Sequence, residues 1–287
     1  MMQRKILLLK EHHRRNDSHG LFKTVRDLEG KQKKSLSIVK DKNGVKHFKQ
    51  EDILKLWKEH FERHLNTSFP HDEALEELDN IQVQTDFNNQ KIDKTEIKKA
   101  ISKMKRNKSP GYDSITFEVI KASGEIMIEM LYKIFNEIWR CDKTPKDFSR
   151  MIVCPVYKKG DRQCPENYRA ISLLSIPGKI FLRILMERMQ EKLTSKLKES
   201  QYGFRAGRGT VDAVFIVRQI IEKAKEKRFP LHFHFIDFKA AFDTVWRHAL
   251  WKMMNCTGIN PKIIKIIKYM YDNTMLHPRR WSDDRMV

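Results

Sequence analysis

The chain has 287 residues, of which 40% are hydrophobic, so it can bury a substantial core and wholesale disorder is excluded. Its 57 lysines and arginines against 37 acidic residues leave a formal charge of +20, which favours polyanionic partners. The four cysteines are too few for a disulfide-stapled secreted protein, and no apolar run suits a signal peptide or a membrane span. These features predict an intracellular protein that does not enter the membrane.

Residues 1–90 are expected to form a connector that is largely helical or irregular. It begins with a basic segment, which has 14 basic and 5 acidic groups in the first 50 residues, and it ends as an acidic, loop-like stretch. Between these parts, residues 51–65 are predicted to be a helix because apolar residues recur on one face at helical spacing. Those residues are Ile53, Leu56, Trp57 and Phe61.

Two more helices are predicted before the first strand. One starts at Asp93 or Thr95, either of which is a plausible N-cap, and stops at residues 109–111, Ser-Pro-Gly. The other covers about residues 125–140 and ends before Pro145. Their apolar spacing indicates that both pack on a core.

The pattern then changes to two short strands. The run MIVCPVYKKGD is rich in β-branched residues and closes on a lysine-glycine turn, and NYRAISLLS is the second candidate. A helix over about residues 177–193 follows, and another begins near Thr210 with Val214 and Phe215 on its apolar face. The glycine-arginine loop QYGFRAGRGT separates these two helices.

After Pro230 the segment LHFHFIDF alternates in the manner of a buried strand, and it ends in the carboxylate of Asp237. Helical spacing resumes over residues 240–254 and stops near Gly258, and Pro261 suits the first turn of a last helix. An apolar strand has little reason to end in a carboxylate unless water, a cation or a helix N-terminus meets it. Asp237 is therefore either a cap for the next helix or a functional acid.

Four segments in order resemble the reverse transcriptases of non-LTR, LINE-like retrotransposons. FIDFKAAFD is similar to the first catalytic palm motif of that family, and KSPGYDSI to the Pro-Gly-x-Asp motif of its fingers. MIVCPVYKKGDRQCPENYRAISLLSIPGKI is similar to the paired finger strands, and QYGFRAGRGTVDAVFIVRQI to the segment that leads into the palm. The resemblance covers roughly residues 93–275.

The resemblance implies an α+β fold, namely the fingers and a partial palm of a right-hand polymerase behind the connector. It places the fingers at residues 91–230 and the start of the palm at residues 231–287. The implied function is RNA-directed DNA polymerisation by two-metal nucleotidyl transfer, with an RNA template, a DNA primer and deoxynucleoside triphosphates as partners. The oligomeric state stays open.

The resemblance also assigns roles to single residues. Asp237 is the catalytic residue and binds Mg²⁺, for which oxygen ligands are suited, and the carbonyl of Phe238 is a further ligand. Phe242 is the aromatic gate that packs on the sugar of the incoming nucleotide, and Ala241 leaves room beside the carboxylate. A core aromatic at a helix start is the alternative for Phe242.

Basic residues of the fingers are expected to meet phosphates. Arg169 matches the arginine that contacts the incoming triphosphate, where its planar fork of donors suits phosphate oxygens, and Lys158 or Lys159 adds a point charge. Arg205 and Arg208, in the glycine-arginine loop, are expected to touch template or primer phosphates. The alternative for that loop is a plain surface turn.

The chain also departs from the family pattern, and two alternatives remain open. The paired aspartates that complete the metal cage are not recognisable, and we interpret Asp283-Asp284 near the end as a chance acidic pair. We therefore expect a truncated polymerase that is inactive as this fragment, with an exposed sheet edge at the strand of Asp237. The alternatives are a non-catalytic nucleic-acid-binding remnant or domesticated protein, and a related polymerase such as an intron-encoded maturase.

Overall fold

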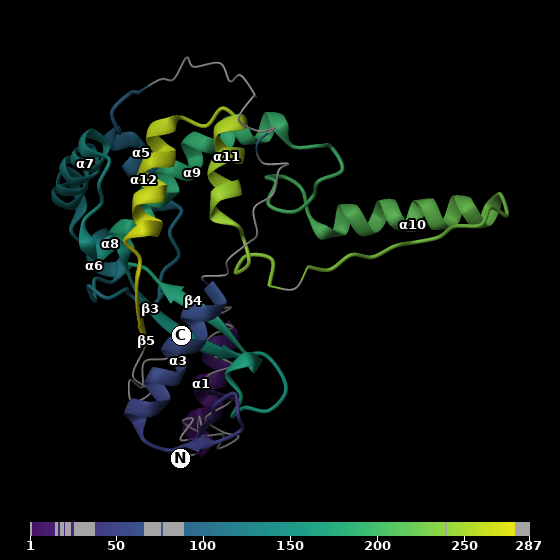
Figure 1. The fold of residues 1–287 in the computed structure, drawn as a ribbon, viewed down its shortest axis with the longest axis horizontal. Helices are drawn as coiled ribbons and strands as arrows, with labels where there is room; N and C mark the ends of the chain where they lie inside the picture. The colour runs from purple at the N-terminus through teal and green to yellow at the C-terminus, as the bar shows by residue number, and fades with distance from the viewer. Residues whose placement is uncertain are drawn as a thin grey trace.

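The computed structural model describes residues 2–14, 17, 20, 24–25, 38–65, 76, 89–238 and 240–278. Helices and strands are mixed, as the predicted α+β class requires, and Figure 1 shows their arrangement. The helices are α1 (Met2–Arg14), α3 (Gln50–Leu65), α5 (Lys94–Ser102), α6 (Phe117–Ala122), α7 (Gly124–Cys141), α8 (Lys146–Ser149), α9 (Ile176–Lys196), α10 (Thr210–Glu226), α11 (Arg247–Cys256) and α12 (Pro261–Asp272). The strands are β1 (Val39–Lys40), β2 (Lys46–His47), β3 (Arg150–Tyr157), β4 (Tyr168–Leu173) and β5 (Met275–Pro278), and the 3-10 helix η2 spans Pro165–Asn167.

The main core lies where α5, α7, α9 and α12 pack together. Its centre is aromatic: Phe135 of α7 and Phe181 of α9 are fully buried with ring centroids 5.1 Å apart, and Phe148 of α8 is 6.4 Å from Phe181. Such contacts add to the burial energy of large apolar side chains. The apolar faces predicted for residues 125–140 and 177–193 thus do pack on a core.

Polar side chains fix where several of these helices begin. Asp93 caps α5 and, with Glu96, forms a capping box, so one of the two predicted caps is confirmed. The hydroxyl of buried Ser175 accepts a hydrogen bond from the amide of Gly178 at the start of α9. Asn260 caps α12, whose first residue is Pro261 as predicted.

The two predicted finger strands form an antiparallel hairpin. β3 pairs with β4, so that Val156 lies opposite Arg169 and Tyr157 opposite Tyr168. β5 adds to the other edge of β3 in parallel. A second core covers one face of the hairpin, where α3 packs through Ile53, Trp57 and Phe61 on Val153 and Tyr168.

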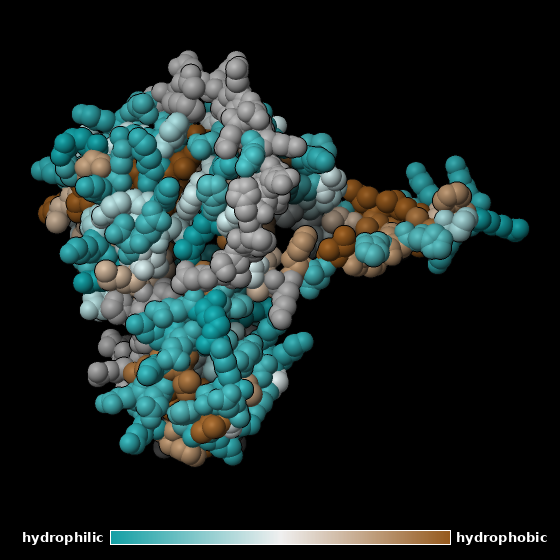
Figure 2. Space-filling view, in the orientation of Figure 1, coloured by the Kyte–Doolittle hydropathy of each residue, from teal (hydrophilic) through white to brown (hydrophobic). Residues whose placement is uncertain are grey.

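The prediction that LHFHFIDF forms a third strand is wrong. Residues 231–238 are extended but belong to no sheet. Together with α10 they form a projection, called the arm below (residues 210–238), which leaves the body and returns to it (Figure 1). Figure 2 shows hydrophobic side chains gathered along it. The alternation describes a side-chain pattern, whereas a strand also needs a partner for its backbone, and the described residues supply none here.

The apolar face expected for α10 is likewise exposed. Its helix forms from Thr210 as predicted, but Val214 and Phe215 remain 65% and 60% exposed because nothing among the described residues covers them. The helix expected from residue 240 begins later, at Arg247, and residues 240–243 form turns instead. Asp237 therefore does not cap a helix. In the part of the chain that the structure describes, no helix is long and apolar enough to cross a membrane.

Candidate functional site

The hairpin turn between β3 and β4 is held by its own hydrogen bonds. The Lys158 amide donates to the Asn167 carbonyl at 2.8 Å, and the Tyr157 hydroxyl donates to the Gly160 carbonyl at 2.6 Å. Gly160 has a φ of +91°, a backbone conformation that strongly favours glycine. Lys158 thus leaves the sheet at a defined point with its side chain exposed.

Arg169 lies on the outer face of the hairpin. Its neighbours on that face, Val156 and Ile171, are also exposed, whereas Tyr168 and Val153 of the other face are buried under α3. Because side chains alternate along a strand, the cover on one face fixes Arg169 on the other. The predicted triphosphate contact of Arg169 stays a prediction, and the structure leaves its side chain exposed, opposite a residue two positions before Lys158.

Asp237 and Phe238 lie near the end of the returning arm, and both are exposed. Among the described residues, no hydrogen bond or ion pair reaches the Asp237 carboxylate. A carboxylate and a backbone carbonyl are oxygen donors of the kind that Mg²⁺ prefers. Two donors are too few to hold two cations, however, and in the described part of the chain no three His, Cys, Asp or Glu side chains gather as a metal site would require.

The turn that follows carries Ala241 and Phe242. Ala240 has a φ of +53°, which is unusual for a residue with a Cβ, and its carbonyl accepts hydrogen bonds from the amides of Asp243 and Thr244. This tight turn presents Phe242 to the outside, where its ring is 77% exposed and meets Phe204 edge to face at 5.8 Å. Phe242 is therefore not the core aromatic that was the alternative prediction.

Arg205 and Arg208 of the glycine-arginine loop converge on one acidic residue, Glu199. Arg205 contacts the Glu199 carboxylate at 2.7 Å and the Lys198 carbonyl at 3.0 Å, and Arg208 contacts the other carboxylate oxygen. Arg208 also lies over the Tyr202 ring. Both arginines thus already have an acidic partner, and their contact with nucleic acid stays a prediction.

The predicted site residues form separate groups. Lys158 and Arg169 both lie on the hairpin, Ala241 and Phe242 share the turn, and Arg205 and Arg208 meet on Glu199. No hydrogen bond, ion pair or ring contact of the described residues joins the hairpin pair to Asp237. Asp283 and Asp284 lie outside the described residues.

The loop KSPGYDS lies against the start of α9. A Cβ on Gly111 would come within 2.4 Å of the Ser175 amide nitrogen, so only glycine fits there. Asp113 accepts a hydrogen bond from the Ile115 amide, and burial raises the pKa of its carboxyl. Burial also lowers the pKa of Lys179, whose charge lies near Asp113. This motif is therefore a packed turn that joins α9 to the residues before α6.

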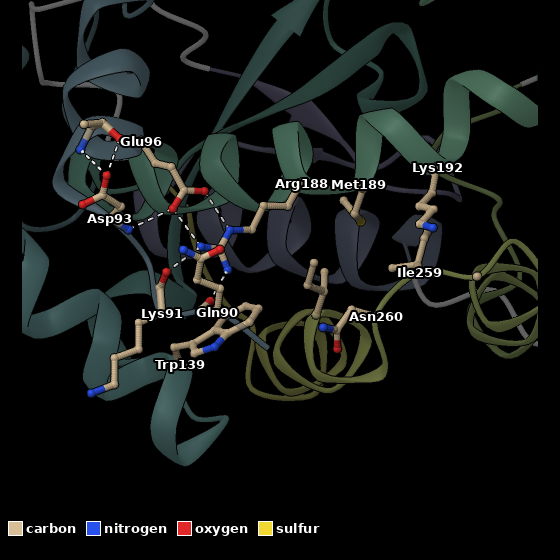
Figure 3. A pocket seen from close by; sticks show the side chains of 13 residues that line it. Gln90, Lys91, Asp93, Glu96, Trp139, Arg188, Met189, Lys192, Ile259 and Asn260 are labelled. Atoms are coloured by element: carbon tan, nitrogen blue, oxygen red, sulfur yellow. Dashed lines mark hydrogen bonds and ion pairs between the residues drawn. The ribbon is translucent and has the colours of Figure 1, made fainter. Parts of the chain in front are cut away.

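A pocket of about 450 Å³ lies elsewhere, between α5, α7, α9 and the start of α12 (Figure 3). Arg188 crosses it and pairs with both carboxylate oxygens of Glu96, at 2.8 and 2.7 Å, while its guanidinium lies over the Trp139 ring. It also donates to the carbonyls of Gln90 and Lys91. These contacts tie the segment before α5 to α9, and none of the predicted site residues lines this pocket.

Comparison with known proteins finds a family match over the end of β3 and the residues that follow it. Residues 156–284 match the family described as reverse transcriptase (RNA-dependent DNA polymerase). This part of the chain is similar to reverse transcriptases. The match begins in β3 and includes Arg169, the arm and Phe242.

The relatives are named as RNA-directed DNA polymerases of transposons or mobile elements. The chain is 32% identical over 201 residues to a probable RNA-directed DNA polymerase from transposon BS of Drosophila melanogaster, covering 66% of this chain and 22% of that protein. It is 29% identical over 180 residues to the RNA-directed DNA polymerase from the mobile element jockey of Drosophila funebris, covering 62% of this chain and 20% of the relative. The chain thus spans about a fifth of the length of these curated relatives.

The sequence does not single out three residues that position the matched segment. It predicts Trp57 only as part of an apolar face, and it gives no signal for Lys40 or Arg188. Lys40 contacts Asp161, which is 121 residues away, and Arg188 contacts Glu96 across 92 residues. No local pattern signals pairs of such separation.

Proposed function

We propose that the chain carries the fingers (residues 91–230) and the start of the palm (residues 231–287) of an RNA-directed DNA polymerase from a non-LTR retrotransposon. The family match of residues 156–284 is the observation that carries the proposal. Its partners are then an RNA template, a DNA primer and deoxynucleoside triphosphates. The formal charge of +20 suits these polyanions.

In this proposal the hairpin and the turn meet different parts of the incoming nucleotide. Arg169 and Lys158 stand on an exposed face, where a guanidinium and an ammonium can bind phosphate oxygens. Phe242, exposed at the turn, packs on the sugar, and Ala241 leaves space beside it. Because the side chains of Arg169, Lys158 and Phe242 are already exposed, these contacts with the nucleotide would not break any buried interaction of the chain.

Asp237 and the Phe238 carbonyl are proposed as the oxygen ligands that this chain contributes to Mg²⁺ during nucleotidyl transfer. Among the described residues, no further carboxylates gather with them to complete a metal site. When bound, the cations supply charge stabilisation for the in-line displacement at phosphorus. The open position of the Asp237 carboxylate supports this role, since no ion pair of the described residues neutralises it.

The test is RNA-templated primer extension with Mg²⁺ and the four deoxynucleotides. It uses a fusion in which the part of the BS transposon polymerase that follows the matched region continues this chain. Asp237→Asn should reduce incorporation by at least about a hundredfold, because loss of a metal ligand removes several kcal/mol of transition-state stabilisation. Glu226→Gln, which removes an exposed acid at the end of α10, is the charge-matched control and should leave the rate unchanged.

Equal incorporation by the Asp237→Asn and parent fusions would overturn the catalytic assignment. The sugar gate has a separate readout, because Phe242→Ala should raise the use of ribonucleotides relative to deoxynucleotides without reducing primer binding. If residues 1–287 bind the RNA–DNA duplex with the usual salt dependence, with and without Asp237→Asn, while the parent fusion incorporates no nucleotide, the non-catalytic binding alternative is favoured.

A further inference from the structure

The inner face of the β3–β4 hairpin rests on one helix, α3. Trp57 is 1% exposed, its ring stacks on Phe61 with centroids 5.4 Å apart, and it meets the edge of the Tyr168 ring at 5.0 Å. Tyr168 is the residue next to Arg169 and opposite Tyr157 in the ladder. The position of Trp57 therefore sets how the outer face, with Arg169, is oriented.

The segment before α3 holds the tip of the same hairpin. The Lys40 ammonium contacts the Asp161 carboxylate at 2.7 Å, and the Lys40 amide donates to the Gln163 carbonyl at 2.8 Å. The hydrogen bond with Asp161 raises the pKa of Lys40, and the same contact lowers the pKa of Asp161. The tip and the covered face of the hairpin are thus both attached to residues 39–61.

The last turn of α3 reaches a different place, the turn that carries Phe242. The His64 Nε2 atom lies 3.3 Å from the Asp243 carboxylate, and Arg247 donates to the Leu65 carbonyl at 3.0 Å. Asp243 is the residue after Phe242, and Arg247 starts α11. His64 is itself oriented by the parallel ring of His60, at 6.0 Å.

We infer that α3 is a brace that fixes the nucleotide-facing hairpin relative to the Phe242 turn, with His64 as a positioning residue for deoxynucleotide selection. The inference rests on the proposed function, because it takes Arg169 and Phe242 as the two contacts of one nucleotide. Because α3 contacts both the covered face of the hairpin and the turn that carries Phe242, it holds Arg169 and Phe242 at a fixed separation. His64 acts through Asp243 and does not touch the nucleotide.

The experiment measures saturation of ultraviolet cross-linking of radiolabelled dTTP, and of UTP in parallel, to residues 1–287 with an RNA template, DNA primer and Mg²⁺. His64→Ala should weaken dTTP labelling by about threefold to tenfold and lower the preference over UTP, on the scale of one lost hydrogen bond of ordinary strength. His64→Gln should restore both, because the amide nitrogen can donate to Asp243. Lys58→Ala, on the exposed face of the same helix, is the matched control and should resemble the parent.

Two further measurements separate positioning from general loss of structure. Amide exchange should accelerate over residues 240–247 in His64→Ala, while residues 150–173 keep the protection of the parent. In an Asp243→Ala background, His64→Ala should add no further effect, since the two residues act as a pair. Equal labelling by His64→Ala and the parent, or failure of His64→Gln to restore labelling, would overturn the brace.

Failure of the proposed function gives a different result. If Arg169→Ala and Phe242→Ala label as the parent does, the nucleotide site itself is wrong and the brace has no nucleotide to position. If those two variants lose labelling and dTTP preference while His64→Ala does not, the nucleotide site stands and only the brace is wrong.

Discussion

Two segments of this chain have the same strand pattern but different structures. Residues 150–157 and 231–238 are both short, apolar and rich in residues that favour strands. The first is paired on both edges and covered by α3, whereas the second is unpaired and its Phe235 and Ile236 are 84% and 73% exposed. The difference teaches that alternation becomes a sheet only where the chain also supplies a neighbouring strand and a covering face.

The same contrast separates the body from the arm as a whole. In the body, Phe135, Phe181 and Ile184 are at most 2% exposed, while α10 has no buried residue. An exposed apolar surface of this extent is typical of a surface that binds a partner. Side-chain removal should therefore be costly in the body and nearly free in the arm.

The largest expected effect is the loss of an aromatic ring from the support of the hairpin. Trp57→Ala should reduce the free energy of unfolding by about 3–5 kcal/mol, because it empties the centre of the second core. Phe235→Ala, the matched change in the arm, should alter it by less than about 0.5 kcal/mol. Urea denaturation followed by circular dichroism measures both, and similar losses in the two variants would contradict the contrast.

The apolar faces were the part of the fold that the sequence predicted well, and the arm shows the limit. The helices at residues 51–65, 125–140 and 177–193 follow from apolar spacing, which is local information. The same spacing predicts that α10 forms but cannot say that its face stays uncovered, because cover comes from distant segments. The seven-residue delay of the helix that starts at Arg247 has a similar cause, since the turn at Ala240 is held in part by the contact of His64 with Asp243.

The sequence nominates the candidate site residues but does not predict how they are grouped. Motifs point to Lys158, Arg169, Phe242 and Asp237, whose roles stay predictions, and the structure exposes each of them. Their surroundings were not predictable: the pairing of Arg205 and Arg208 with Glu199, and the support of the hairpin by Trp57, are tertiary contacts. A motif indicates which chemistry a residue can perform, whereas the tertiary packing decides which other residues contact and position its side chain.

A smaller effect is expected where glycine allows close backbone approach. Gly111→Ala should destabilise the chain by about 1–3 kcal/mol, because the new Cβ would overlap the backbone of Leu174 and Ser175, which cannot move as a side-chain end can. Gly203→Ala, in the loop before the arm, meets nothing within 4 Å and should be neutral. Thermal unfolding of the two variants measures the difference in stability. If Gly111→Ala is as stable as the parent, the prediction is wrong and the backbone of the turn at KSPGYDS can shift to make room for the new Cβ.

The smallest predicted effect compares an ion pair of the body with one of the arm. Burial pushes the pKa of Glu96 up, but the hydrogen bonds from Arg188 and from the Asp93 amide outweigh it, so the pKa is lowered on folding. A lowered carboxyl pKa contributes stability above the unfolded pKa and loses it as the pH falls through the folded one. Glu96→Gln should thus cost about 1–2 kcal/mol at neutral pH, and progressively less at acidic pH, as the pH falls through the lowered pKa of Glu96 and the parent loses the same charge. Glu222→Gln, which removes the exposed pair with Arg218 on α10, should change stability by less than about 0.5 kcal/mol. Denaturation curves at neutral and at acidic pH measure the loss of unfolding free energy in Glu96→Gln. A loss that does not depend on pH would contradict the prediction, because the Glu96 side chain would then stabilise the fold through its shape and not through its charge.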